Sequence, residues 1–132
     1  MCEMLDVLGA PMIVKRDEGL FVAEHPIPPG YFVPPHVHDE DDEMLYVLEG
    51  ELTLIDDAGE RPVGPGGFVR FRPGARHGFR NDTPGTVKLL VLAQPGFQAA
   101  EMFRHFDRAA RATALAPARV VTIAAEYGVR FG

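Results

Sequence analysis

The sequence predicts an all-β domain, folded as a barrel or a sandwich, followed by a pair of α-helices. The 14 glycines and 12 prolines punctuate the chain up to Gly96 at short intervals, and the segments between them favour strands. Neither residue occurs between Gly96 and Pro117, where Ala, Arg, Met and Phe favour a helix. A length of 132 residues with 46% hydrophobic and 24% charged residues suits one folded domain, which we expect to span residues 1–132.

Six strands are predicted, each bounded by turn-forming residues. Short strands at such intervals are typical of barrels and sandwiches, and we expect the barrel to cover about residues 12–94. A run of Asn, Asp, Thr, Pro and Gly joins the last two strands, and Asn81 at its start is expected to be a turn residue. The predicted strands are residues 20–25, 30–38, 44–55, 67–71, 77–81 and 86–93.

Two amphipathic helices are expected to cover the barrel over about residues 97–128. Phe103, Phe106 and Ala110 fall on one face at helical spacing. Residues 112–116 are short and apolar and are predicted to form a turn between the helices. A second apolar stripe consists of Val120, Ile123, Ala124 and Tyr127.

The composition excludes several classes of function. The chain has no serine and therefore no serine nucleophile. Its only cysteine, Cys2, lies in a terminus that is expected to fray, so internal disulfides are excluded and a reduced, cytoplasmic setting fits best. No apolar run reaches the roughly eighteen residues of a membrane span, and Glu3 and Asp6 stand where a signal peptide needs positive charge. A net charge of −6 repels phosphate backbones, so neither nucleic acid nor a membrane is an expected partner.

A group of histidines and one glutamate has the pattern of metal ligands. His36 and His38 are two residues apart in a predicted strand, so both rings point to one face at a spacing of about 6.6 Å. The dipeptide alone also fits an exposed strand beside the acidic residues 39–42, which are expected to form an exposed turn. Glu43 resumes the strand and can return its carboxylate to the same face, while His77 comes from a different strand. Three imidazoles and one carboxylate suit a first-row transition metal.

The spacing of these residues resembles the two sequence signatures of the cupin superfamily. The resemblance covers about residues 20–93. It departs at Arg72, where cupins usually have proline, and this puts the turn before His77 in question. The matching positions are Gly30-x5-His36-x-His38-x4-Glu43-x6-Gly50 and Gly66-x5-Arg72-x-Gly74-x2-His77-x3-Asn81.

The resemblance implies a double-stranded β-helix, which is a jelly-roll barrel, with one divalent transition-metal ion near its mouth. The ion would be Fe, Mn, Ni, Cu or Zn, and its ligands would be His36, His38, Glu43 and His77. Two further histidines, His25 and His105, lie outside both signatures and are expected to be surface or structural residues.

An apolar substrate pocket is expected beside the ion. Alternation along the strands places several apolar side chains on the face of the ligands. The segment from Pro95 to Phe106 also resembles, more weakly, the helical tail of single-domain cupins related to flavonol-cleaving (quercetin) dioxygenases. That helix either packs on the core or closes the barrel over a planar substrate. The expected pocket residues are Phe32, Pro34, Leu45, Val47, Phe79, Phe103 and Phe106.

Three functions remain open at this point. The first is an oxidoreductase, most favourably a dioxygenase acting on a small organic molecule, with Glu43 as both ligand and catalytic base. The second is a non-redox isomerase, cyclase, lyase or hydrolase that uses the ion as a Lewis acid. The third is a non-catalytic module that binds a small ligand. A homodimer is expected as well, because Leu48, Leu52 and Leu54 are predicted to point outward.

Overall fold

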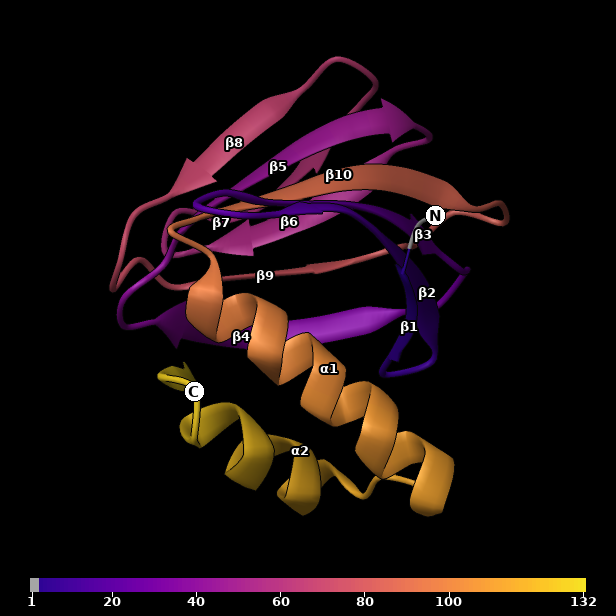
Figure 1. Cartoon of the computed structure of the whole chain (residues 1–132). Helices are drawn as coiled ribbons and strands as arrows, with labels where there is room; N and C mark the ends of the chain where they lie inside the picture. Colours follow the sequence, from indigo (N-terminus) through magenta and orange to yellow (C-terminus); the bar gives the residue numbers. More distant parts are fainter. Residues whose placement is uncertain (1–2) are drawn as a thin grey trace.

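The computed structural model describes residues 3–132 and consists of two antiparallel sheets that face each other, with two helices at one side (Figure 1). Cys2, for which we expected a frayed terminus, lies outside the described residues. The predicted all-β fold with two C-terminal helices is confirmed. The six-stranded sheet runs in the order β1 (Glu3–Val7), β2 (Ala10–Asp17), β3 (Phe21–Ile27), β10 (Val87–Gln94), β5 (Asp42–Glu49), β8 (Phe68–Phe71). The five-stranded sheet runs in the order β11 (Val129–Phe131), β4 (Phe32–His38), β9 (His77–Arg80), β6 (Leu52–Asp56), β7 (Gly59–Val63).

The hydrophobic core lies between the two sheets. Buried and half-buried positions alternate along the central strands, so every second side chain enters the core. Apolar burial of this kind is the main source of stability in a protein of this size. The fully buried residues of the core include Phe21, Ile27, Leu45, Leu52, Leu54, Val87 and Leu89.

The predicted strand over residues 44–55 is in fact two strands in different sheets. The chain crosses from β5 to β6 at Gly50, which has a φ of 81°. A Cβ there would lie 3.0 Å from the side chain of Val87 and 3.2 Å from the backbone oxygen of Thr86, so glycine suits the crossing in two ways.

This crossing reverses the direction of the side chains that follow it. Leu52 and Leu54 were expected to point outward, and the structure shows both to be 0% exposed, inside the core. Leu48, before the crossing, is half-buried. Of the three leucines that suggested a dimer, only Leu48 is therefore on the outer face.

Four strands were not predicted from the sequence. β1 and β2 form a hairpin whose turn uses Leu8 and Gly9, at φ values of 57° and 92°, so the first sheet begins well before residue 12. β7 is mainly exposed and contains Pro62, and such a sequence is compatible with a strand only at a sheet edge. β11 has only three residues, too few for a detectable alternation.

The two predicted helices are present as α1 (Phe97–Ala112) and α2 (Pro117–Ala125). α1 lies across the open side of the two sheets and α2 runs beneath it (Figure 1). The predicted apolar face of α1 is confirmed, since Phe103 and Phe106 are buried. Within the described residues, neither helix is long and apolar enough to cross a membrane.

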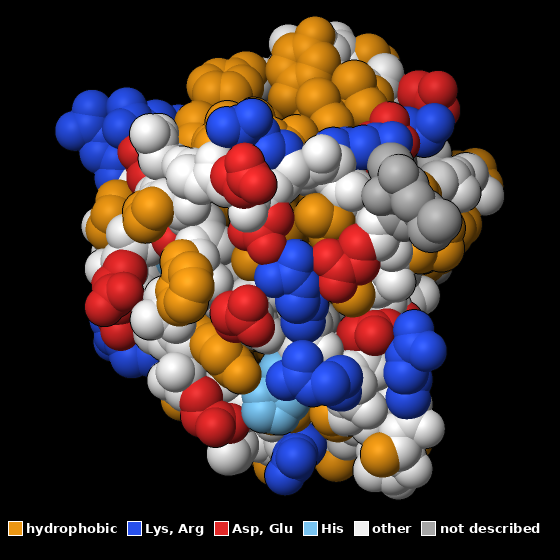
Figure 2. All heavy atoms as spheres, in the orientation of Figure 1, with side chains coloured by type: hydrophobic (Ala, Val, Ile, Leu, Met, Phe, Trp, Pro, Cys, Tyr) orange, Lys and Arg blue, Asp and Glu red, His pale blue; other side chains and the backbone are white. Residues whose placement is uncertain are grey.

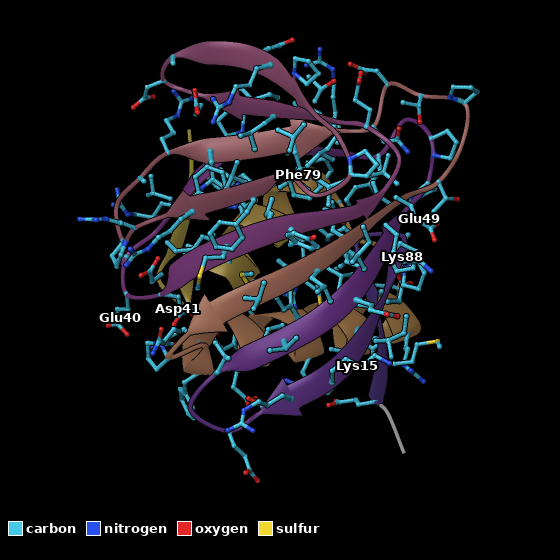
Figure 3. The ribbon with its side chains drawn as sticks, turned by 90° about the horizontal axis from the view of Figure 1, so that it is seen from above. Lys15, Glu40, Asp41, Glu49, Phe79 and Lys88 are labelled. Carbon is cyan, nitrogen blue, oxygen red and sulfur yellow. The ribbon has the colours of Figure 1, made fainter. Side chains whose placement is uncertain are left out.

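Asp41 corrects the expectation of an exposed acidic turn over residues 39–42. Its side chain is 2% exposed, and its two carboxylate oxygens accept hydrogen bonds from the backbone N–H groups of Gly96 at 3.0 Å and Ala99 at 2.9 Å. Figure 3 shows Glu40 and Asp41 at the end of the barrel where the chain leaves β10 for α1. Gly96 has no side chain to cap the helix, so Asp41 supplies the acceptors from 55 residues away.

Candidate metal centre

The four predicted ligands converge inside the barrel. His36 and His38 come from β4, His77 from the neighbouring strand β9, and Glu43 from β5 in the opposite sheet. His36 stands directly across from His77 in the strand register. One ligand atom from each of the four residues lies within 4.8 Å of the others, and all four side chains are buried.

A β-bulge in β4 sets the direction of the histidine rings. Val33 faces Phe79 and His36 faces His77, so three steps along β4 match two steps along β9. The extra residue falls at Pro34 and Pro35, whose nitrogens have no hydrogen to contribute to the ladder.

The same bulge explains an error in the predicted pocket. It reverses the alternation before His36, so Phe32 and Pro34 point outward and Phe32 is 52% exposed. Val33 lines the interior in their place. The sequence shows the two prolines but not the extra residue that they place in the strand.

Glu43 lies between two of the imidazoles. Its Oε1 is 2.8 Å from Nε2 of His77, and its Oε2 is 3.2 Å from Nε2 of His38. The Phe71 ring stacks on His77 at a centroid distance of 3.8 Å, with the planes 1° apart. Such packing restrains the His77 ring in the orientation that faces Glu43.

Hydrogen bonds to the backbone fix the proton position on two of the rings. His36 donates from Nδ1 to the Pro34 oxygen at 2.9 Å, and His77 donates from Nδ1 to the Ala75 oxygen at 3.1 Å. A carbonyl oxygen only accepts, so in the neutral rings Nε2 carries a lone pair. These lone pairs and the Glu43 carboxylate point toward one another, an arrangement that a cation would stabilise. The residues therefore fit a divalent metal ion.

The third ring is held differently. Nδ1 of His38 is buried and has no hydrogen-bond partner among residues 3–132. Metal-binding histidines usually donate from the second ring nitrogen, so His38 is the least constrained of the three imidazoles.

The charge states of the cluster also suit metal binding. Burial raises the pKa of Glu43, but the imidazoles of His38, His77 and His36 outweigh it and hold that pKa well below its usual value. Burial, assisted by His77, lowers the pKa of His36 to about 4. At neutral pH Glu43 is therefore ionised and His36 neutral, and these are the forms that bind metals.

A partly open, mainly apolar cavity adjoins the cluster. Its volume is about 60 Å³, and Met102, Phe103 and Phe106 of α1 form part of its wall. Of the predicted pocket residues, Val47 is buried in the core and does not line the cavity. Four of the predicted pocket residues do line it: Leu45, Phe79, Phe103 and Phe106.

The turn before His77 contains Arg72 and is hydrogen-bonded within itself, since the N–H of Ala75 donates to the backbone oxygen of Arg72 at 2.9 Å. The N–H of Gly74 donates to the backbone oxygen of His38 at 2.8 Å, which ties this turn to the ligand strand. Arg72 itself is exposed. Asn81 is a turn residue as predicted, because its side-chain oxygen accepts a hydrogen bond from the N–H of Thr83 two residues later at 2.9 Å. Its side-chain nitrogen donates to the backbone oxygens of Ile27 and Gly85 at 3.0 and 2.8 Å.

Comparison with known proteins gives the family. A family model described as a cupin domain matches residues 24–93, which is more than half of the chain. The chain belongs to the cupin family. All the positions that resembled the cupin signatures, from Gly30 to Asn81, lie within these residues.

Similar proteins have several different activities. Quercetin 2,3-dioxygenase of Bacillus subtilis is 32% identical over 83 residues, which are 62% of this cupin and 24% of that protein. A cupin from Silicibacter pomeroyi described as a sugar phosphate isomerase is 31% identical with a TM-score of 0.61, over 65% of this chain and 59% of that one. The polyketide cyclase RemF of Streptomyces resistomycificus is 28% identical with a TM-score of 0.61, over 72% and 73% of the two chains. This cupin thus spans about a quarter of the dioxygenase and less than two thirds of the isomerase.

The two histidines outside the signatures differ in position. His105 lies on α1, where its Nδ1 is 2.9 Å from the Tyr127 hydroxyl. His25 is 3% exposed and lines the cavity, and sequence reasoning assigned it no site role. The alternation of β3 contains the signal, because His25 shares its face with Phe21, Ala23 and Ile27.

Proposed function

We propose that this cupin is a metal-dependent enzyme that acts on a small organic molecule, most favourably as an oxidoreductase of the dioxygenase type. The observation that carries the proposal is the convergence of three imidazoles and one carboxylate at the wall of an apolar cavity. The similarity to a quercetin 2,3-dioxygenase supports the choice of reaction class.

The residues divide the work of such an enzyme between them. His36, His38, Glu43 and His77 would hold the ion, which when bound supplies a Lewis acid or a redox centre. Glu43 also lines the cavity, and in this proposal its ionised carboxylate accepts a proton from a bound substrate. The apolar side chains around it exclude water from that position.

Elemental analysis tests the metal site. We expect the purified protein to contain one equivalent of a divalent transition metal and a His77→Ala variant to lose at least nine tenths of it. His105→Ala is the matched control, because His105 lies outside the cluster, and it should retain the metal. Stoichiometric metal in the His77→Ala protein would contradict the proposed coordination.

A non-redox reaction is the second candidate. It is favoured by the similarity to proteins described as a sugar phosphate isomerase and a polyketide cyclase. Oxygen uptake with phenolic and enolic compounds separates the two candidates: turnover that consumes oxygen supports the dioxygenase, and equal turnover under nitrogen supports an isomerase or cyclase. A tightly bound ligand without turnover under either condition would support a non-catalytic binding module.

We also propose a homodimer, formed by the outer face of the six-stranded sheet. Tyr46 and Leu90 are paired on that face and half-buried, as is Leu48. Phe68 on the neighbouring edge strand is 56% exposed, and Figure 2 shows hydrophobic side chains gathered at that upper end of the molecule. Sedimentation at micromolar concentration tests the proposal, and a monomer there would reject it.

A further inference from the structure

His25 is a buried imidazole that belongs to the cavity but not to the metal cluster. It lies on β3, opposite Leu89 of β10, whereas Glu43 lies opposite Ala93 of the same strand. The two residues are thus four positions apart along the sheet, about 13 Å in strand length. The cavity has one polar end at the cluster and a second at His25.

The ring of His25 has a defined tautomer. Nδ1 lies 2.8 Å from the backbone oxygen of Pro11, and because a carbonyl only accepts, Nδ1 carries the proton. Burial lowers the pKa of the ring and keeps it neutral, so Nε2 has a free lone pair. Tyr31 packs edge-on against this ring at a centroid distance of 5.9 Å and helps to hold it in place.

Nε2 of His25 has no hydrogen-bond partner among residues 3–132. Among the other polar side chains that line the cavity, Nδ1 of His38 also has no hydrogen-bond partner, and it lies in the metal cluster at the far end. His36, His38 and Glu43 belong to the metal cluster, and the Tyr31 hydroxyl donates to the backbone oxygen of Val7 at 2.7 Å. Nε2 of His25 is not fully enclosed by protein atoms, and His25 lines the cavity, so a ligand hydroxyl in the cavity can reach this acceptor and donate to it.

We propose that Nε2 of His25 accepts a hydrogen bond from a hydroxyl group of the molecule that occupies the cavity. His25 then selects hydroxylated compounds, phenols or enols, and orients them with the hydroxyl away from the metal cluster. The assignment rests on the proposed function, because it takes the cavity to be the substrate site.

Binding of phenol and toluene tests this assignment. The two molecules have nearly the same shape, and only phenol has a hydroxyl to donate. Affinities are measured by NMR titration of zinc-loaded protein. An apolar cavity without an acceptor favours toluene, because phenol is better hydrated in water. Because His25 supplies an acceptor, we expect the wild type to bind phenol at least as tightly as toluene.

Two substitutions at His25 separate the acceptor from the structural hydrogen bond. In His25→Asn the side-chain amide takes the place of Nδ1 and still donates to Pro11, but the acceptor at Nε2 is lost. Phenol should then bind about tenfold more weakly while toluene is unaffected. His25→Gln puts an amide oxygen near the place of Nε2 and should restore most of the preference for phenol.

Tyr31→Phe is the control within the same cavity, since it removes a hydroxyl but leaves His25. It should leave the ratio of the two affinities unchanged, and thermal unfolding checks that each variant is folded. Wild-type protein that binds toluene more tightly than phenol, or that binds neither probe, would overturn the assignment without recourse to any variant. Unchanged phenol binding in His25→Asn would overturn it as well. The zinc content of the same samples shows separately whether the proposed metal site stands.

Discussion

His36 and His77 orient their rings by the same local hydrogen bond. Each donates from Nδ1 to the backbone oxygen two residues earlier in the chain, Pro34 or Ala75. The acceptor is part of the same segment, so the direction of Nε2 is set by the local backbone and needs no ion. The sequence signatures predicted which residues meet, but not these contacts, because spacing does not specify the backbone angles that bring the carbonyl under the ring.

Stability should depend on pH through His36. Burial lowers its pKa to about 4 in the folded protein, whereas an unfolded histidine titrates near 6.5. Between these values the unfolded chain binds a proton that the folded chain does not, so the free energy of unfolding rises with pH. The contribution is complete above about pH 6.5, and about 3 kcal/mol of it is lost on acidification to about pH 4.

Urea unfolding of metal-free protein between pH 7 and pH 4, in the presence of a chelator, measures this contribution. His25 acts in the same direction, because burial also lowers its pKa. The slope should be smaller in a His36→Gln variant and unchanged in His105→Gln. Equal slopes in the wild type and His36→Gln would show that His36 is not buried in its neutral form.

At the scale of the elements, the bulge of β4 depends on a glycine in β9, its neighbour in the sheet. A Cβ on Gly78 would lie 2.5 Å from the backbone oxygen of Val33 and 2.9 Å from Pro34 and Pro35 atoms. Since these are backbone or ring atoms, β4 would have to move. Gly78→Ala should therefore cost about 2 kcal/mol of stability and weaken metal binding by separating His36 from His77.

Thermal unfolding and metal titration of the Gly78→Ala protein measure the two effects. Gly85→Ala is the matched control, because a Cβ there has nothing within 4 Å, and it should alter neither quantity. A Gly78→Ala protein with wild-type stability would mean that the bulge is mobile enough to accept the methyl group.

The attachment of α1 depends on Asp41. In an Asp41→Ala variant the N–H groups of Gly96 and Ala99 lose their acceptor in a buried place, at a cost of about 2 kcal/mol. Glu40→Ala is the control, since Glu40 is exposed and makes one long contact to Gln98 at 3.4 Å. Urea unfolding should show a clear loss for the first variant and less than about 0.5 kcal/mol for the second. Equal free energies of unfolding for the two variants would mean that apolar contacts alone hold α1 in position.

At the scale of the whole molecule, the sequence predicted the β-rich body, the two helices and the meeting of four ligands from separate strands. These features depend on alternation, on turn residues and on signature spacing, all of which are local patterns. The errors arose where a tertiary event changed the pattern. The bulge reversed Phe32, the crossing at Gly50 reversed Leu52 and Leu54, and the contact of Asp41 joins residues too distant in the chain for any periodicity to reveal.

Zinc binding should slow the exchange of the amide hydrogens of α1. The helix is joined through Asp41 to the segment between His38 and Glu43, so ordering the ligands orders its first turn. Hydrogen exchange with and without zinc measures the effect, which we expect to be several-fold in the wild type and absent in Asp41→Ala. Slowing of equal size in both proteins would indicate a route through the core instead.

The position of Asp41 links the binding of the metal ion to the entry of a ligand into the cavity. Asp41, which holds the first turn of the helix that covers the cavity, and Glu43, which would hold the ion, are two residues apart along the chain, so the positions of the helix and of the ion are coupled. Such coupling is reciprocal. If metal binding stabilises α1 in its position over the cavity, a ligand that holds α1 away from the cavity lowers the metal affinity by the same factor. A change that increases the metal affinity of this barrel should therefore make the entry of large ligands more difficult.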